Sequence, residues 1–216
     1  MFRDREDAAR QLAERLKGRT LRRPLVLAIP RGGVPVGAVL AHELNAELDV
    51  VLARKLRAPL QPEFAIGAIS ESGEVYLNPD VADMMGAYGD HLDQEKRHQL
   101  AELARRKEMF RKVRPRADVA GRSVILTDDG IATGSTMIAA LQLLRTQSPH
   151  DIIVAVPVAP LDRLDKIESL CDDLICVLRP VRFYAIGQFY EDFSPVEDER
   201  VVEILKEQKT AAEAAV

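Results

Sequence analysis

The segment "VILTDDGIATGSTM", residues 124–137, joins a short apolar run to two adjacent aspartates and then to a loop of small residues. The apolar run predicts a buried strand, and the chain from Ser135 onward predicts a helix. Backbone N–H groups at a helix start, together with the helix dipole, form an anion site, and Gly134 lets the backbone approach an oxyanion closely. Thr133 and Thr136 add hydroxyl donors beside that of Ser135. The loop therefore suits a phosphate monoester.

Asp128 and Asp129 stand just before this loop, at the end of the predicted strand. Two carboxylates there can accept hydrogen bonds from a vicinal diol, such as the 2- and 3-hydroxyls of a ribose, or hold a hydrated Mg²⁺. The segment as a whole thus predicts a pocket for a ribose 5-phosphate. The plainer alternative is a turn followed by a helix cap. No lysine precedes Ser135, so this is not the Gly-Lys-Ser/Thr phosphate loop.

Apolar strand-like runs alternate with amphipathic helical segments along most of the chain. This alternation predicts an α/β fold with a central parallel sheet flanked by helices, whose ligands bind beyond the carboxyl ends of the strands. A hairpin turning at "ESGE" (71–74) and a long charged helix over 90–112 interrupt the pattern. The predicted strands are 25–30, 48–55, 123–129, 151–158 and 173–180, and the other predicted helices are 4–17, about 35–45, 135–147, 160–170 and one from about 196.

Composition narrows the class of protein. With 216 residues, 47% hydrophobic and 30% charged, the chain suits one globular domain. A net charge of −4 does not suggest a nucleic-acid binder or a membrane-surface protein. No apolar run is long enough to cross a bilayer, and residues 1–11 lack the apolar core of a secretory signal. Only Cys171 and Cys176 are present, which fits a reducing, cytoplasmic setting.

"VILTDDGIATGSTM" resembles the motif with which type I phosphoribosyltransferases bind 5-phosphoribosyl pyrophosphate (PRPP). The resemblance implies a Rossmann-like sheet with a small hood formed by the C-terminal segment, other contributions being left open. It divides a single domain, 1–216, into a core of about 20–180, an aromatic hood segment of about 181–195 and a C-terminal helix over 196–210. It also implies that Asp128 and Asp129 hold the ribose. The implied 5-phosphate contacts are Ile131, Ala132, Thr133, Gly134, Ser135 and Thr136.

Two further segments resemble the parts of the family's site that contact pyrophosphate. "IPRGGVPV" (29–36) looks like the family's pyrophosphate loop, with Arg31 contacting pyrophosphate and Gly32 and Gly33 bringing backbone amides close. "ARKLRAPLQPEFAIGAI" (53–69) stands where the family has a flexible loop that closes over the reaction. The cations expected to neutralise the leaving group there are Arg54 and Lys55, whereas Arg57 reads equally well as an ordinary loop cation. The catalytic set implied by the resemblance is Asp128, Asp129, Arg31 and Lys55.

The sequence says less about the hood and about the identity of the acceptor than about the PRPP site. "RFYAIGQFYEDF" (182–193) resembles the segment in which an aromatic ring stacks on the base, although large aromatics also build cores. The candidates are Phe183, Tyr184, Phe189 and Tyr190. Ala132 occupies the position where transferases of 6-oxopurines carry an acid/base aspartate, so these substrates are disfavoured. Overall the chain looks closest to bacterial phosphoribosyltransferase-like proteins with an unassigned acceptor.

The resemblance implies a cytoplasmic pentosyl-group transferase of nucleotide metabolism. It would use Mg²⁺, held indirectly through Asp128 and Asp129 by water or PRPP, with PRPP and a nitrogenous acceptor as partners. The alternative is a regulator that senses PRPP or a nucleotide without catalysis. Nucleic acid and membrane are not expected as partners, and a homodimer stays open. Residues 90–116 carry nine Lys or Arg and five Asp or Glu, which favours a solvated helix over an RNA or protein docking face.

Overall fold

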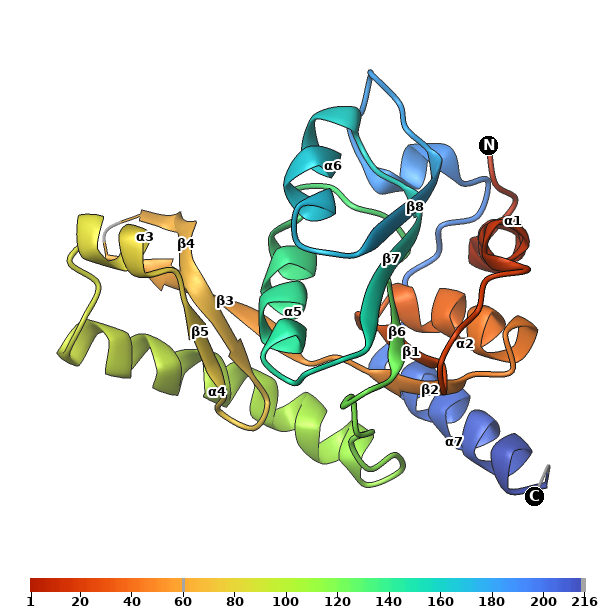
Figure 1. The fold of residues 1–216 in the computed structure, drawn as a ribbon, viewed down its shortest axis with the longest axis horizontal. Coiled ribbons are helices and arrows are strands. Elements are labelled where there is room, and N and C mark those ends of the chain that lie inside the picture. Colours follow the sequence, from red (N-terminus) through yellow and green to blue (C-terminus); the bar gives the residue numbers. More distant parts are fainter. Residues whose placement is uncertain (60, 215–216) are drawn as a thin grey trace.

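A computed structural model describes residues 1–59 and 61–214 of the chain. Its centre is a five-stranded parallel sheet in the order β2-β1-β6-β7-β8 (Figure 1). These strands are Glu47–Val50, Leu25–Ala28, Ser123–Thr127, Asp151–Val158 and Asp173–Leu178. The predicted central parallel sheet is confirmed, and β6, which precedes the two aspartates, lies in its middle.

Helices cover both faces of this sheet, as the alternation of apolar runs requires. Side chains of β1 show the division: Val26 and Ala28 pack into one apolar cluster, and Leu25 and Leu27 into another. The first cluster is closed by α1 (Arg5–Leu16), α2 (Gly33–Glu43) and α7 (Asp198–Ala214). The second is closed by α5 (Ser135–Arg145) and α6 (Leu161–Glu168) (Figure 1). Both faces are therefore buried.

A second, antiparallel sheet stands beside the first and corrects one prediction. The run predicted as a single strand, 48–55, is divided: β2 ends at Val50, and β3 (Ala53–Ala58) belongs to the second sheet. The break falls at Val51 and Leu52, within the apolar residues 50–53, where no periodicity could reveal it. Likewise, much of the segment predicted as a flexible loop forms β3 and β4 (Gln61–Ser70), while residue 60 lies outside the described residues.

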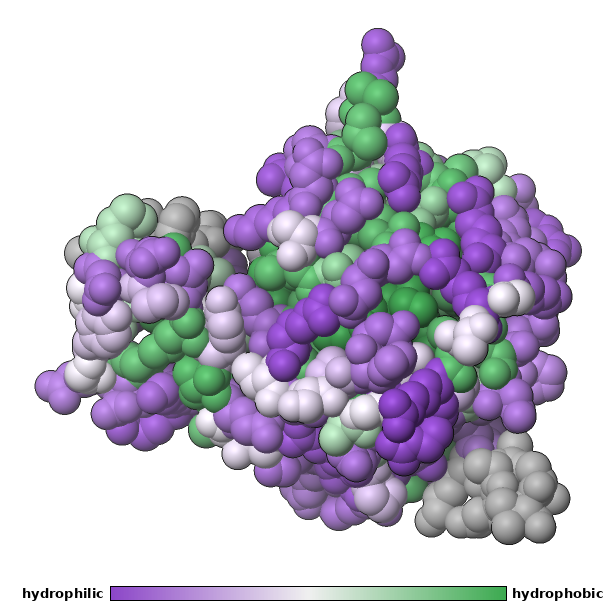
Figure 2. Space-filling view, viewed as in Figure 1, coloured by the Kyte–Doolittle hydropathy of each residue, from purple (hydrophilic) through white to green (hydrophobic). Residues whose placement is uncertain are grey.

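The remaining elements complete this second lobe. The hairpin predicted at "ESGE" is confirmed, since β4 pairs with β5 (Val75–Leu77) across that turn. The short helix α3 (Pro79–Met84) and the long helix α4 (Asp90–Arg111) follow, and α4 runs along the lower edge of the molecule from the second lobe to the first (Figure 1). Hydrophilic residues cover much of the visible side of α4 (Figure 2). Among the described residues, no helix is both long and apolar enough to span a membrane.

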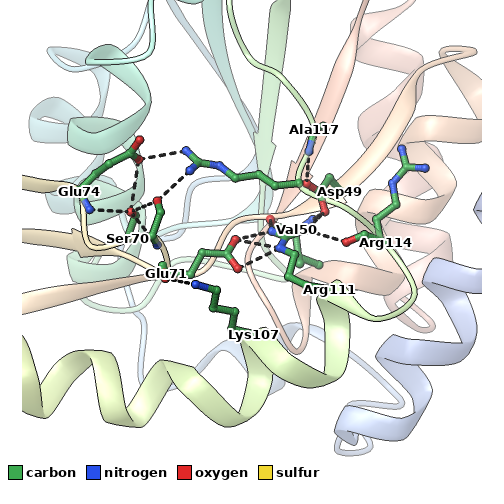
Figure 3. A network of polar contacts seen from close by, with 11 residues as sticks. Asp49, Val50, Ser70, Glu71, Glu74, Lys107, Arg111, Arg114 and Ala117 are labelled. Atoms are coloured by element: carbon green, nitrogen blue, oxygen red, sulfur yellow. Dashed lines mark hydrogen bonds and ion pairs between the residues drawn. The ribbon is translucent and has the colours of Figure 1, made fainter.

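A network of ion pairs fastens the two lobes together (Figure 3). Arg111 of α4 donates from Nη1 to Asp49 Oδ1 at 2.6 Å and from Nε to Glu71 Oε2 at 2.9 Å. Lys107 Nζ donates to the carbonyl oxygen of Glu71 at 2.9 Å, and the amide of Ala117 donates to Asp49 Oδ2 at the same distance. Burial raises the pKa of Asp49, and Arg111 opposes that rise. The end of β2 and the β4–β5 turn thus share one guanidinium.

The N-terminal residues pair with the segment that follows β8. The amide of Phe2 donates to the carbonyl oxygen of Phe189 at 2.8 Å, and the amide of Glu191 donates to that of Phe2 at 2.9 Å. Phe189 ends a short 3₁₀ helix, η1 (Ile186–Phe189), which follows β8. The C-terminal aromatic segment, which the sequence predicts as the hood, therefore pairs with the N-terminal residues.

Candidate active site

Asp128 and Asp129 lie at the carboxyl end of β6, where the sequence predicts ligand binding. Asp129 is buried, at 7% exposure, and Asp128 is half-buried. The amide of Asp129 donates to Asp128 Oδ1 at 2.8 Å, which holds the first carboxylate against the backbone. Burial raises the pKa of Asp128 well above its ordinary value, and repulsion from Asp129 adds to the rise. Burial also raises the pKa of Asp129.

The turn after β1 is pressed against this pair, and only glycine allows the approach. A Cβ on Gly32 would lie 1.9 Å from Asp129 Oδ2, and one on Gly33 would lie 2.8 Å from the Cα of Asp128. The structure thus brings the predicted pyrophosphate loop and the predicted ribose pair into direct contact. Arg31 precedes Gly32 in this turn. It is paired on the surface with Glu197, from Nη1 to Oε2 at 2.9 Å.

The loop from Ile131 to Thr136 forms a cradle beside Asp128. Gly134 has a φ of +77°, a left-handed conformation that glycine adopts without a Cβ penalty, and α5 begins at the next residue. The amide of Ser135 donates to Thr133 Oγ1 at 3.4 Å, and the next N–H groups of α5 have no intrahelical acceptor, so they remain available to an anion. The loop lines a hollow of about 190 Å³ that also includes Asp128 and Ile186 of η1.

A larger cavity of about 450 Å³ adjoins this cradle on the side of the second lobe. Its walls include Arg54, Lys55 and Arg57 from β3 and the same Thr133, Ser135 and Thr136 that line the cradle. Arg54 Nε donates to Gln99 Oε1 of α4 at 2.6 Å, and Arg57 Nε donates to Glu95 Oε1 at 2.7 Å. Two hollows, one of them rich in cations, therefore meet at one set of hydroxyls.

Arg5 is a member of the site that the sequence did not reveal. Its Nε donates to Asp129 Oδ2 at 2.9 Å, its Nη1 donates to the carbonyl oxygen of Ser194 at 2.8 Å, and its guanidinium lies 4.0 Å from the ring centre of Phe193. Arg5 lowers the pKa of Asp129, against the larger effect of burial. Its partner is 124 residues away in the chain. As the first residue of an amphipathic helix, Arg5 gave no signal that separated it from a surface cation.

Comparison with known proteins gives the family. The family model described as the phosphoribosyl transferase domain matches residues 3–193. The chain belongs to the phosphoribosyl transferase family. Among solved structures, this phosphoribosyl transferase domain is similar to TT1426 from Thermus thermophilus, with 43% identity and a TM-score of 0.90 over 96% of this chain and 98% of that one. The family predicted from the motif at 124–137 is confirmed.

Two curated Mycobacterium tuberculosis relatives, from strains H37Rv and CDC 1551, are 43% identical to the phosphoribosyl transferase domain over 205 residues. Both are assigned only provisionally as phosphoribosyl transferases. The match covers 95% of this chain and 46% of each relative. The chain therefore spans about half the length of these curated relatives.

The predicted hood aromatics of this phosphoribosyl transferase domain fall into two groups. Tyr190 is buried, its ring centre lies 5.2 Å from that of Phe2, and its hydroxyl donates to the carbonyl oxygen of Asp129 at 2.6 Å. Burial raises its pKa. Phe183 and Phe189 stack on each other at 5.6 Å, and Tyr184 is 87% exposed. Tyr190 thus supports the end of β6, Phe183 and Phe189 pack against the apolar cluster around Phe2 and Tyr190, and none of the four predicted aromatics lines either hollow.

Proposed function

We propose that this domain binds PRPP with Mg²⁺ and transfers its 5-phosphoribosyl group to a nitrogen of a base or related amine, releasing pyrophosphate. One observation carries the proposal: the cradle and the cation-lined cavity share Thr133, Ser135 and Thr136. A ligand with a phosphate at one end and a diphosphate at the other suits two adjoining anion sites. The ribose between them would lie beside the carboxylates at the end of β6.

The donor would be held by three sets of groups. Asp128 and Asp129 would accept hydrogen bonds from the ribose diol, and the backbone and hydroxyls of residues 131–136 would bind the 5-phosphate. The pyrophosphate would lie between the turn at Arg31, Gly32 and Gly33 and the cations of β3. The groups proposed for pyrophosphate are Arg31, Gly32, Gly33, Arg54 and Lys55.

In the proposed reaction the bond between C1 of the ribose and the pyrophosphate oxygen breaks, and the oxygen keeps the electron pair. The lone pair of the acceptor nitrogen forms the new bond to C1, and the proton of that nitrogen passes to solvent water. Cations around the pyrophosphate stabilise the charge that it gains, and the two carboxylates offset positive charge developing on the ribose. Holding both substrates next to each other in the right orientation supplies much of the remaining acceleration.

The residues at the strand end fit an indirect metal site. Within the described chain, no three His, Cys, Asp or Glu side chains are grouped so as to hold a metal ion by themselves. Mg²⁺ usually keeps several waters and binds through one or two carboxylates together with substrate phosphates. Asp128 and Asp129 would therefore hold it through water or PRPP, and when bound it would neutralise charge on the pyrophosphate.

Ala132 bears on the acceptor. This exposed methyl group stands where an acid/base aspartate would serve a 6-oxopurine, and an alanine side chain can neither give nor take a proton. We therefore propose an acceptor nitrogen that is nucleophilic without such help, bound against the hood at Phe183, Tyr184 and Phe189. A sensor of nucleoside monophosphates would have no use for the cations of the larger cavity, so that cavity favours a transferase.

The proposal is tested in two steps. Millimolar PRPP with Mg²⁺ should raise the melting temperature of the wild-type domain, because a ligand that binds only the folded state stabilises it. The double variant Asp128→Asn, Asp129→Asn should lose that shift, whereas Asp118→Asn, an exposed carboxyl that precedes β6, should keep it. No shift in the wild type would refute PRPP binding.

Pyrophosphate release from PRPP, measured across a panel of bases and small amines, then separates the transferase from the sensor. At least one acceptor should give release that depends on both substrates. Binding of PRPP without release over the whole panel would favour the sensor. Full turnover with hypoxanthine or guanine would contradict the inference from Ala132.

A further inference from the structure

Helix α4 presents a stripe of polar side chains to the cation-lined cavity. Glu95, Gln99, Glu102 and Arg106 follow one another at spacings of three and four residues, which places them on one face of the helix. Gln99, Glu102 and Arg106 line the cavity directly. Glu95 and Gln99 are also hydrogen-bonded to each other, from Nε2 of Gln99 to Oε1 of Glu95 at 2.8 Å. This face of α4 therefore belongs to the cavity wall and is not a plain solvated surface.

The first residues of this stripe hold cations of β3. Gln99 accepts a hydrogen bond from Arg54, and Glu95 accepts from Arg57 on both Oε1 and Oε2. Arg106 lies two turns beyond Gln99 and brings a cation of its own. The cationic side chains that line the cavity are thus Arg54, Lys55, Arg57 and Arg106, and among the described residues of its wall the one carboxylate is that of Glu102.

Among the described residues, Arg106 makes one ion-pair contact, through Nε of its guanidinium. Its Nε lies 3.4 Å from Oδ1 of Asp198, whose side chain is only 4% exposed at the start of α7. Within the described residues this is the sole polar contact of the Arg106 side chain, so its two terminal nitrogens have no protein partner there. The neighbouring Arg105, 65% exposed, also pairs with Asp198 but does not line the cavity. Arg105 alone would neutralise Asp198, so the ion pair does not require a second arginine facing the cavity.

We propose that Arg106 is a further pyrophosphate-binding residue, contributed by α4 and opposite the cations of β3. The proposal rests on the function proposed above and names one more group of the same site. A guanidinium whose two terminal nitrogens have no partner among the described residues can offer their N–H groups as a fork that matches two phosphate oxygens. Pyrophosphate, with charge on two phosphoryl groups, gains from cations on two sides of the cavity. A ribose 5-phosphate, which has no second phosphate group, gains nothing from Arg106.

The test compares Arg106→Ala, Arg106→Lys and Arg105→Ala with the wild-type chain by titration calorimetry. The ligands are PRPP, inorganic pyrophosphate and ribose 5-phosphate, each with Mg²⁺. Arg106→Ala should weaken PRPP and pyrophosphate binding by about tenfold to a hundredfold, the usual range for lost hydrogen bonds to a charged group. Its affinity for ribose 5-phosphate should stay within about twofold. Arg106→Lys should restore part of the loss, because lysine keeps the charge without the fork.

Arg105→Ala is the matched control, since it removes the neighbouring cation from the same carboxylate and should bind all three ligands as the wild type does. Wild-type affinity of Arg106→Ala for PRPP and pyrophosphate would overturn the inference and leave the proposed function standing. Equal losses for all three ligands would also overturn it, because the change would then act on the fold and not on pyrophosphate. A wild-type chain that binds neither PRPP nor ribose 5-phosphate would overturn both proposals.

Discussion

Replacing Arg5 by alanine should destabilise the domain far more than its place as the first residue of α1 suggests. Arg5 and Asp129 form an ion pair whose side chains are only 11% and 10% exposed. The same guanidinium donates to Ser194 and lies against the ring of Phe193. Arg5→Ala removes all three contacts and leaves Asp129 buried, with its pKa already raised and its cationic partner gone.

Breaking a buried ion pair by removing one partner typically costs about 3–5 kcal/mol in the free energy of unfolding. In a domain of this size each kcal/mol shifts the melting temperature by about 2–4 °C, so a fall of roughly 6–20 °C is expected. Arg3→Ala is the matched control. Its ion pair with Asp7 joins a side chain that is 71% exposed to one that is 18% exposed, and surface pairs of this kind contribute about 0.2–1 kcal/mol.

Thermal and urea unfolding of Arg5→Ala, Asp129→Asn and the double variant measure the coupling between the two side chains. The double variant should be less destabilised than the sum of the single variants, because the neutral amide that replaces the carboxylate at position 129 no longer needs a cation. Loss of Arg5 should also raise the pKa of Asp129 further. Because PRPP binding needs the ionised carboxylate, lowering the pH should then weaken PRPP binding at a higher pH than in the wild type. Additive single effects, or a loss no larger than that of Arg3→Ala, would refute this reasoning.

Three further changes test the strand end. Asp128→Asn should raise the melting temperature at neutral pH while weakening PRPP binding. The pKa of each aspartate is raised in the folded domain, so the pair is tolerated without cost below the unfolded pKa and destabilises the fold as pH rises through the folded pKa values. The gain in melting temperature should therefore vanish near pH 4. Gly32→Ala forces the carboxylate of Asp129 to move, and kcat/KM for PRPP should fall about a hundredfold; near wild-type turnover would contradict this. Tyr190→Phe leaves a buried carbonyl unpaired and should cost about 1–3 kcal/mol in urea unfolding, with an unchanged midpoint as the contrary result.

The sequence was sufficient where the signal is local. The apolar runs of β1, β6 and β7 are strands covered on both faces, and the small residues around Gly134 form a strand–loop–helix turn as the motif predicts. Gly32 likewise stands where close approach of the backbone demands it. In each case the residue types within a few positions determine the backbone conformation, so distant partners need not be known.

The sequence failed where the deciding contact is distant or the pattern is ambiguous. The break between β2 and β3 lies inside an apolar run, and only pairing of β3 with β4 reveals it. Arg5 and Arg106 are two among 30 Lys and Arg, and nothing nearby in the chain distinguishes them from solvated cations. Their acidic partners, Asp129 and Asp198, reach them only in the folded molecule.

The shared guanidinium of Arg111 has a consequence for how this protein would behave in a genetic screen. Without Arg111, Asp49 and Glu71 would be left as two buried carboxylates, and the end of β2 would lose its tie to the turn that closes the second sheet. That sheet carries Arg54. Alleles of Arg111 would therefore be recovered alongside those of residues that touch the ligand. A map of inactivating mutations would then extend along α4, well outside the pocket. If every position on that map were taken as a ligand contact, the size of the bound molecule would be overestimated.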